Sequence, residues 1–188
     1  MKSCLLLIDI QESFRQRPYF DAQALPAYMD AQNALIEGAQ RHGVPIVRIL
    51  HTDGPKTASN PFSIESGHVR PMKELREITP AASFIKTRHS ALVGTGLDVW
   101  LIENGIQRVV VSGIRTEQCC ETTTRHASDL GFAVDYVTDA THTFDMQHDD
   151  GSAFKAADIK KRTAAVLKDR FATICTVAQA VERMARGD

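Results

Sequence analysis

Three residues with chemically reactive side chains follow short apolar runs in the sequence, either directly or after a few residues. These residues are Asp9, Lys86 and Cys119. A carboxylate, an ammonium group and a thiol could act as proton acceptor, charge stabiliser and nucleophile in one covalent reaction. Each also has a structural interpretation: Asp9 could cap a turn, Lys86 could face solvent, and Cys119 could be a small buried residue. The combination of all three favours chemistry.

The segment before Cys119 is suited to activating a thiol. Thr116 is a good helix N-cap and Glu117 would lie in the first turn, so Cys119 would fall near the third helical position. Free amides and the helix dipole favour a thiolate there, and a nearby Lys86 ammonium would lower the thiol pKa further. An adjacent carboxylate could accept the thiol proton.

Cys120 points about 100° away from Cys119 around a helix. Its spacing to Thr123, Ala127 and Leu130 is typical of a buried helix face. We therefore interpret Cys120 as a core residue, with a resolving thiol of a redox protein as the alternative. Adjacent cysteines on one helix cannot easily form a disulfide, because their side chains diverge.

Short apolar runs alternate with longer helical patterns along the chain, which predicts an α/β fold. Continuous apolar runs are typical of strands buried on both faces of a mainly parallel sheet. Right-handed crossovers then favour a doubly wound, Rossmann-like three-layer α/β/α sandwich. The expected strands are residues 4–8, 44–50, 83–86, 107–112, 132–137 and 171–175, and the expected helices are 24–41, 94–104, 116–130, 152–169 and 176–186.

Such a sheet binds its ligand beyond the carboxyl ends of the strands, at the point where the strand order reverses. Asp9, Lys86 and the segment 113–119 all follow expected strands, and His51 ends the second one. Asp139, just past the fifth strand, is interpreted as a turn residue whose carboxylate accepts hydrogen bonds from backbone amides.

The bulk composition excludes several classes of protein. A chain of 188 residues with 43% hydrophobic content fits one domain, 1–188, with a real core. The net charge of −1 gives no basic surface for nucleic acid or anionic membrane. The four cysteines form no CxxC pair, the N-terminal apolar run is too short for a signal peptide, and no segment approaches the ~20 apolar residues of a membrane span. We therefore expect a cytoplasmic protein.

With these residues in view, the chain resembles the isochorismatase-like cysteine hydrolases, which include nicotinamidases and carbamoylsarcosine amidases. Most of the chain takes part in the resemblance, and the block around Cys119 is the most specific. Three blocks carry it: Leu5-Leu6-Leu7-Ile8-Asp9-Ile10-Gln11-Glu12-Ser13-Phe14, Lys86 to Leu92 with Gly94 to Leu97, and Gly113-Ile114-Arg115-Thr116-Glu117-Gln118-Cys119-Cys120 through to Gly131, closed by Asp139-Ala140.

The resemblance implies a catalytic triad of Asp9, Lys86 and Cys119 on a six-stranded parallel sheet. It also implies a cis peptide between Ile114 and Arg115, and an oxyanion hole made by the amides of Arg115 and Cys119. In the implied mechanism, Asp9 takes the thiol proton, Lys86 stabilises the thiolate, and Cys119 attacks a carbonyl carbon. Asp9 then protonates the leaving amine and activates water.

The sequence departs from individual branches of this family. Isochorismatases proper typically lack the nucleophilic cysteine, so Cys119 argues against cleavage of a vinyl ether. Nicotinamidases hold a metal with an Asp-x-His pair and a further His, whereas this chain has His51-Thr52-Asp53 and, further on, His68. We expect no metal and no cofactor, and interpret His51 as a pocket-wall or hydrogen-bonded residue. Leu92 and Glu117 also replace the usual Phe and Asp.

Position alone predicts the walls of the pocket. Arg115 could enter it and suit an anionic substrate group, or could point outward to solvent or a subunit interface. The stretch 52–67 is expected to be a long loop that covers the site or reaches a neighbour. The expected substrate-binding residues are Phe14, Tyr19, His51, Phe62, Arg115 and Gln118.

The sequence thus predicts a hydrolase that cleaves a small amide or other C–N substrate through a Cys119 thioester. The alternatives are a non-catalytic binding or scaffold relative and a thiol redox protein that uses Cys119. The expected partner is a small molecule, with neither nucleic acid nor membrane involved. Relatives commonly assemble, so a homo-oligomer, dimer or higher, is also expected.

Overall fold

The computed structural model describes residues 1–187 and is built on a six-stranded parallel sheet, in the order β3-β2-β1-β4-β5-β8. Every residue of β1 and β4 is buried, as the unbroken apolar runs predict. The predicted α/β fold class is confirmed. The strands are β1 (Ser3–Ile8), β2 (Ile46–His51), β3 (Ala82–Lys86), β4 (Arg108–Ile114), β5 (Ala133–His142) and β8 (Thr173–Cys175).

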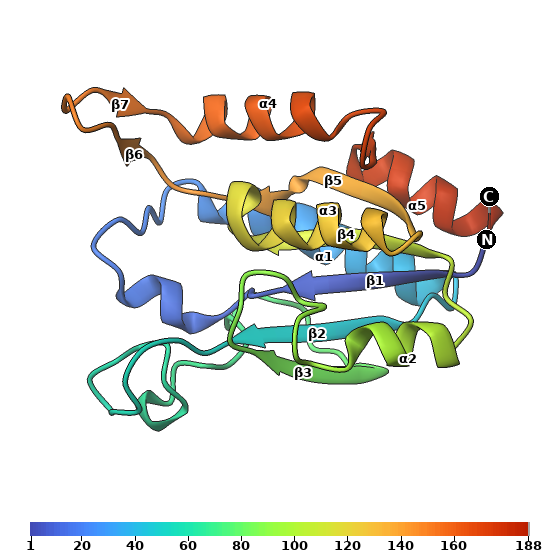
Figure 1. The fold of residues 1–188 in the computed structure, drawn as a ribbon, viewed down its shortest axis with the longest axis horizontal. Coiled ribbons are helices and arrows are strands. Elements are labelled where there is room, and N and C mark those ends of the chain that lie inside the picture. The colour runs from blue at the N-terminus through green and yellow to red at the C-terminus, as the bar shows by residue number, and fades with distance from the viewer. Residues whose placement is uncertain (188) are drawn as a thin grey trace.

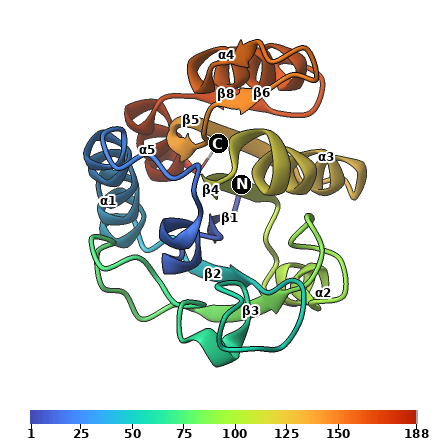
Figure 2. The same cartoon turned by 90° about the vertical axis from the view of Figure 1, so that its left-hand side faces the viewer.

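Helices cover both faces of the sheet, which gives three layers (Figures 1 and 2). α1 (Leu25–Arg41) and α5 (Val177–Arg186) lie on one face, and α2 (Leu97–Glu103) and α3 (Glu121–Asp129) lie on the other. α4 (Ala156–Leu167) packs beside α3 at the β8 end. The buried apolar residues accordingly form two clusters, one on each side of the sheet.

The strand order reverses between β1 and β4. From β1 the chain builds outward through β2 to β3, then returns beside β1 with β4 and builds the other way through β5 to β8. Figure 2 looks at the carboxyl ends of the strands, where the connections after β1, β3 and β4 come together. This is the position at which a doubly wound sheet binds its ligand.

Several predicted boundaries are wrong. The predicted helix 116–130 begins with a π-helical turn, Thr116–Cys120, and becomes α-helical only from Glu121. The predicted strand 132–137 continues to His142, across an irregularity in its pairing with β4. The predicted helix 152–169 starts later, because a small antiparallel hairpin of β6 (Met146–Gln147) and β7 (Ala153–Phe154) precedes α4. Local propensity does not encode these features, since each depends on packing around the carboxyl ends.

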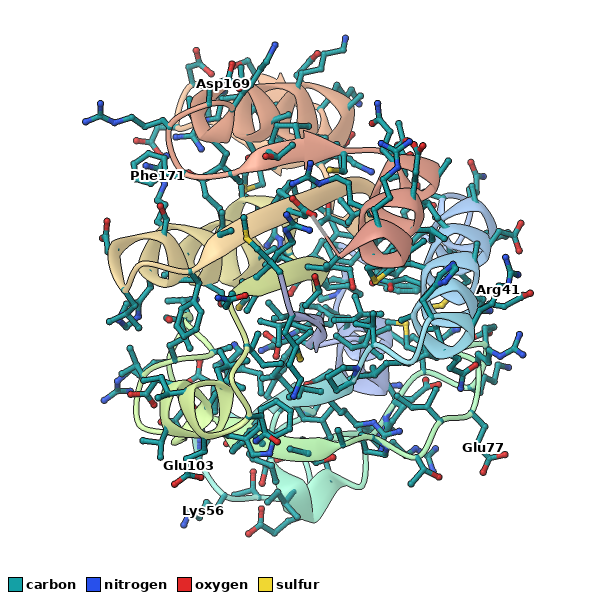
Figure 3. The ribbon with its side chains drawn as sticks, turned by 90° about the vertical axis from the view of Figure 1, so that its right-hand side faces the viewer. Arg41, Lys56, Glu77, Glu103, Asp169 and Phe171 are labelled. Carbon is teal, nitrogen blue, oxygen red and sulfur yellow. The ribbon has the colours of Figure 1, made fainter. Side chains whose placement is uncertain are left out.

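The opposite end of the molecule, at the amino ends of the strands, carries charges of both signs. Arg41, Glu103 and Asp169 point away from the body there (Figure 3), and all three are exposed. This agrees with the mixed charge of the sequence. None of the helices in residues 1–187 has the length and apolar composition that a bilayer-spanning helix needs.

Candidate active site

The turn after β1 holds Asp9 in an unusual backbone conformation. Asp9 has a φ of 53°, in the left-handed region that Asp and Asn tolerate better than most residues. Its amide donates to the Ile49 carbonyl oxygen at 2.9 Å. The side chain of Gln11 then clamps this turn to β2, because Gln11 Oε1 accepts from the His51 amide at 2.7 Å and Gln11 Nε2 donates to the His51 carbonyl oxygen at 3.0 Å. The glutamine of the first motif block is therefore a positioning residue.

The loop after β4 presents Cys119 at the same edge of the sheet. The Ile114–Arg115 peptide bond is cis in the structure. The Arg115 carbonyl oxygen accepts from the amides of Gln118 and Cys120, both at 3.2 Å, which closes the π-helical turn. Thr116 does not cap a helix, contrary to expectation: its hydroxyl donates to Thr141 Oγ1 at 3.0 Å. The turn is thus held by β5, and Cys119 does not stand in an ordinary helix N-terminus.

The structure brings Asp9, Lys86 and Cys119 together, although they come from three strand ends. Lys86 Nζ lies 2.7 Å from Asp9 Oδ2, and both side chains are fully buried. The same ammonium donates to Cys119 Sγ at 3.2 Å. β2 lies between β1 and β3, so the lysine side chain spans the width of one strand to reach its partners.

The electrostatics of this trio differ from the sequence-based expectation of a thiol with a lowered pKa. Burial, together with the charge of Asp9, raises the pKa of Cys119 to about 12, while Lys86 acts in the opposite direction. The expectation is therefore wrong for the resting site, because it left out burial. Burial also raises the pKa of Asp9, although Lys86 opposes this. A carboxylate with a raised pKa is a better acceptor for the thiol proton.

Lys86 keeps its charge although it is buried. Burial lowers the pKa of Lys86, but its interactions with the Asp9 carboxylate and the Cys119 sulfur outweigh this and leave it raised. The ammonium also donates to the Arg88 carbonyl oxygen at 3.1 Å, which fixes its direction.

The His51 ring lies against the same lysine and is not a free ligand. Lys86 Nζ lies 3.2 Å from His51 Nδ1. Burial, with the nearby ammonium, lowers the pKa of His51 to about 4, so the ring is neutral at physiological pH. Among the described residues, no group of three or more His, Cys, Asp or Glu side chains is arranged to hold a metal ion. Independence from metal remains a prediction.

A cavity of about 130 Å³ opens above Cys119. All six predicted wall residues line it. Aromatic contacts order the walls: the Phe14 and Phe62 rings meet edge to face at 5.1 Å, and the Tyr19 and Phe144 rings lie 5.0 Å apart. The lining residues are Phe14, Arg17, Tyr19, His51, Asp53, Phe62, His89, Arg115, Gln118 and Cys119.

Arg115 is part of the cavity wall, the first of the two orientations that the sequence allowed. Its guanidinium lies 5.2 Å from the centre of the Tyr19 ring, and its Nε is 3.1 Å from Glu117 Oε1. The ion pair with Glu117 and the ring contact hold the side chain in place, so Arg115 lies against the cavity and is 11% exposed.

Three lining residues were not predicted as walls. Arg17 packs its guanidinium 4.9 Å from the centre of the Phe62 ring. Asp53, which the sequence suggests only as a metal ligand, accepts a hydrogen bond from the Gly54 amide at 2.8 Å through its Oδ1. His89 lies inside the second motif block, three residues after Lys86, and its Nδ1 is 3.9 Å from Cys119 Sγ. A titratable residue so near a strand-end lysine was a signal that sequence analysis could have used.

Comparison with known proteins shows the family to which this chain belongs. The family model described as the isochorismatase domain matches residues 3–179. The chain belongs to the isochorismatase family of hydrolases.

Two relatives support this membership of the isochorismatase family. The isochorismatase family protein YrdC of Bacillus subtilis is 32% identical over 185 residues, covering 96% of this chain and 95% of YrdC. The ureidoacrylate amidohydrolase RutB of Klebsiella pneumoniae is 27% identical over 173 residues, covering 75% of this chain and 73% of RutB.

A solved structure carries the same fold. The crystal structure of a putative isochorismatase-family hydrolase from Chromobacterium violaceum superposes with a TM-score of 0.86 at 27% identity. The match covers 98% of this chain and 94% of that protein. The isochorismatase architecture therefore extends over nearly all of the chain.

Proposed function

We propose that this isochorismatase-family hydrolase cleaves a C–N bond of a small amide, carbamoyl or ureido compound through a thioester on Cys119. One observation carries the proposal: a buried ammonium joins a carboxylate at 2.7 Å and a thiol at 3.2 Å, and that thiol lines a cavity. The name of RutB, an amidohydrolase of ureidoacrylate, supports the bond type.

The raised thiol pKa shapes the first step. Cys119 rests as a thiol beside Asp9, so proton transfer accompanies attack on the substrate. As Cys119 Sγ bonds to the carbonyl carbon, Asp9 accepts the thiol proton. Lys86 remains an ammonium throughout and stabilises the negative charge, whether it lies on the Asp9 carboxylate or on the Cys119 sulfur.

The carbonyl oxygen becomes negatively charged in this step and requires donors. The loop 115–119 turns tightly around the Arg115 carbonyl oxygen, which accepts hydrogen bonds from the amides of Gln118 and Cys120. We assign the amides of Arg115 and Cys119 as the oxyanion donors, which would stabilise the tetrahedral intermediate.

The walls define a small substrate with an apolar part. The cavity of about 130 Å³ is bounded by Phe14, Tyr19 and Phe62, while the Arg115 guanidinium stands on the same wall. A planar amide group with few further atoms fits this space, and the guanidinium favours an additional acceptor or anionic group on the substrate.

The proposal is tested by labelling and substitution. Cys119→Ala should abolish ammonia release in a screen of small primary amides, carbamoyl compounds and ureido acids while the fold stays intact. Cys120→Ala should keep most of the activity, because Cys120 is fully buried in the apolar core. Cys120→Ala should lower only the free energy of unfolding, by about 1 kcal/mol.

Iodoacetamide gives the matched chemical test. Stoichiometric loss of activity with a single mass adduct on Cys119 is expected. A scaffold protein would be indifferent to the reagent, and a redox protein would respond to peroxide and reductant. If Cys120 proved to be the indispensable thiol, the assignment of the nucleophile would be wrong.

A further inference from the structure

A second cavity lies next to the catalytic one, between the loops that follow β2 and β3. Its volume is about 340 Å³, and Asp53 and Phe62 line both cavities. These two residues are joined, since the Asp53 amide donates to the Phe62 carbonyl oxygen at 3.1 Å. The Phe62 ring also contacts the rings of Phe14 and His51 in the catalytic cavity. The two cavities are therefore neighbours that share one wall.

The catalytic cavity alone is smaller than a usual small-molecule site. Its volume of about 130 Å³ is below the roughly 300–1,000 Å³ that is typical of such sites, whereas the neighbouring cavity lies within this range. A substrate that places its amide at Cys119 and has more than a few further atoms must continue beyond the catalytic cavity. The neighbouring cavity has a fixed floor, because the Thr52 amide donates to the Lys86 carbonyl oxygen at 2.9 Å and joins the ends of β2 and β3.

The acidic residues of the neighbouring cavity, Asp53 and Glu65, already accept hydrogen bonds within their own loop. Asp53 Oδ1 accepts from the Gly54 amide at 2.8 Å, and a carboxylate oxygen of Glu65 accepts from the Ser63 hydroxyl. Each carboxylate thus has a donor from the protein itself.

The cationic residues of this cavity, Lys56 and Arg88, instead have hydrogen-bond donors without protein acceptors. Within residues 1–187 neither forms an ion pair, Lys56 Nζ donates no hydrogen bond, and the Arg88 guanidinium donates only to the Thr87 carbonyl oxygen, at 3.2 Å. A carboxylate is an acceptor that ammonium and guanidinium groups bind strongly. The charges of Asp53 and Glu65 repel a dianion more than a monoanion, so a single carboxylate suits this cavity better than a phosphate does.

We propose that the cavity between the loops after β2 and β3 is a second substrate subsite, in which Lys56 and Arg88 bind a carboxylate at the far end of the substrate. The inference rests on the proposed function, because it places the scissile amide at Cys119. The substrate is then a monoamide of a dicarboxylic acid, with an apolar chain that passes Phe62 and joins the amide to the carboxylate.

Binding to Cys119→Ala tests the subsite without turnover. Isothermal titration compares adipamic acid, which ends in a carboxylate, with hexanamide, which has the same number of carbons and ends in a methyl group. Adipamic acid should bind roughly 10-fold more tightly, and Lys56→Gln combined with Arg88→Gln should remove this preference. The positively charged 6-aminohexanamide should bind no more tightly than hexanamide. Succinamic acid, with its shorter chain, should show no preference over butanamide, because its carboxylate does not pass Phe62.

Turnover gives a second measurement. The ratio of kcat/KM for adipamic acid to kcat/KM for hexanamide, measured by ammonia release, should fall from roughly 10 to about 1 when Lys56 and Arg88 are both replaced by Gln. A ratio within one variant is the suitable quantity, because the Arg88 carbonyl oxygen also orients Lys86 and a shift of this loop would change both rates. Lys168→Gln is the matched control: Lys168 is exposed, follows α4 and should leave the ratio at its wild-type value.

The outcomes separate the subsite from the cleavage chemistry. A preference that survives the replacement of Lys56 and Arg88 but is lost in Arg115→Gln would place the carboxylate in the catalytic cavity and overturn the subsite. Equal binding of adipamic acid and hexanamide, tighter binding of 6-aminohexanamide, or an equal preference in the shorter pair would overturn it too. Ammonia release that persists in Cys119→Ala would instead overturn the proposed function, and the binding comparison would still decide whether the subsite exists.

Discussion

At the scale of single residues, Lys86 is the centre of the site. Its ammonium lies within 3.2 Å of Asp9, Cys119, His51 and the Arg88 carbonyl oxygen. Three of these four are neutral acceptors in the resting state, and the fourth is a buried carboxylate. A carboxylate and a thiolate in one buried site would repel each other unless a cation stood between them.

Lys86→Met should therefore slow the alkylation of Cys119 at neutral pH. Without the ammonium, no cation stabilises the thiolate, which raises the thiol pKa. Burial would also drive Asp9 to its protonated form, so that the thiol would lose its proton acceptor. The rate of iodoacetamide labelling as a function of pH, followed by mass spectrometry, measures this.

The same substitution should destabilise the fold by up to ~3–5 kcal/mol, because the buried Asp9 carboxyl loses its ionic partner and must be protonated in the folded protein. The double variant Asp9→Asn with Lys86→Met is the control, since it removes both charges. It should recover part of the lost unfolding free energy while staying unreactive. Alkylation at the wild-type rate in Lys86→Met would contradict the role of the cation.

His142 provides a pH-dependent prediction of stability. Its ring stacks 5.0 Å from Tyr28 and packs against Phe144, and its Nε2 is buried without a hydrogen-bond partner. Burial lowers the pKa of His142 from 6.5 to about 4. Between these pH values the unfolded chain binds a proton that the folded protein does not, so stability falls as the pH falls from 6.5 towards 4.

His142→Phe should remove this contribution. Urea unfolding at pH 7 and pH 5 should show that the variant gains up to about 2 kcal/mol relative to the wild type on acidification. His51, whose pKa is also about 4, is present in both proteins and cancels in the difference. Parallel pH dependences of the two proteins would contradict the assignment.

At the scale of elements, the close approach of β4 to β1 sets the geometry of the nucleophile loop. Gly113 pairs with Ile8, the residue before Asp9, and has a φ of 135°. A Cβ atom at Gly113 would lie 2.0 Å from the Ile8 carbonyl oxygen. A glycine here is therefore required for the two strands to bring Asp9 and Cys119 together.

Gly113→Ala should destabilise the protein and abolish most of its activity, because β1 and β4 must separate. Gly105→Ala is the matched control. Gly105 has a φ of 64°, but a Cβ there would meet nothing within 4 Å. Gly105→Ala should lower the free energy of unfolding by about 1 kcal/mol, from backbone strain alone, and the variant should keep its activity. Equal losses of unfolding free energy in the two variants would show that the contact with Ile8 does not matter.

The elements also show which features the sequence could predict. Unbroken apolar runs such as that of β4 predicted the strands. Polar residues at the strand ends predicted which catalytic candidates come together, and position in the chain predicted the residues that line the cavity. The π-helical turn and the irregularity in β5 were missed, because they arise from contacts such as the bond from Tyr136 to the Thr116 carbonyl oxygen. The high pKa of Cys119 was missed for the same reason, since burial is a property of the assembled fold.

At the scale of the whole molecule, the sheet ends at β3, a strand that is paired on one side only. β3 pairs only with β2 in the six-stranded sheet and forms one border of the molecule (Figure 2). Ile85 on this strand is 51% exposed, and Ile64 on the preceding long loop is 61% exposed. Exposed edge strands with apolar side chains are prone to pair with another chain.

We therefore expect a homo-oligomer in which a second copy covers β3. Light scattering at micromolar concentration should return a multiple of 20.8 kDa. Ile85→Lys should shift this mass towards the monomer, because charged side chains on an edge strand oppose pairing. Ile102→Lys is the matched control, since Ile102 is 68% exposed but lies on α2 rather than on the edge strand. A clean monomer in the wild type would refute the expectation, and equal effects of the two lysines would move the interface away from β3.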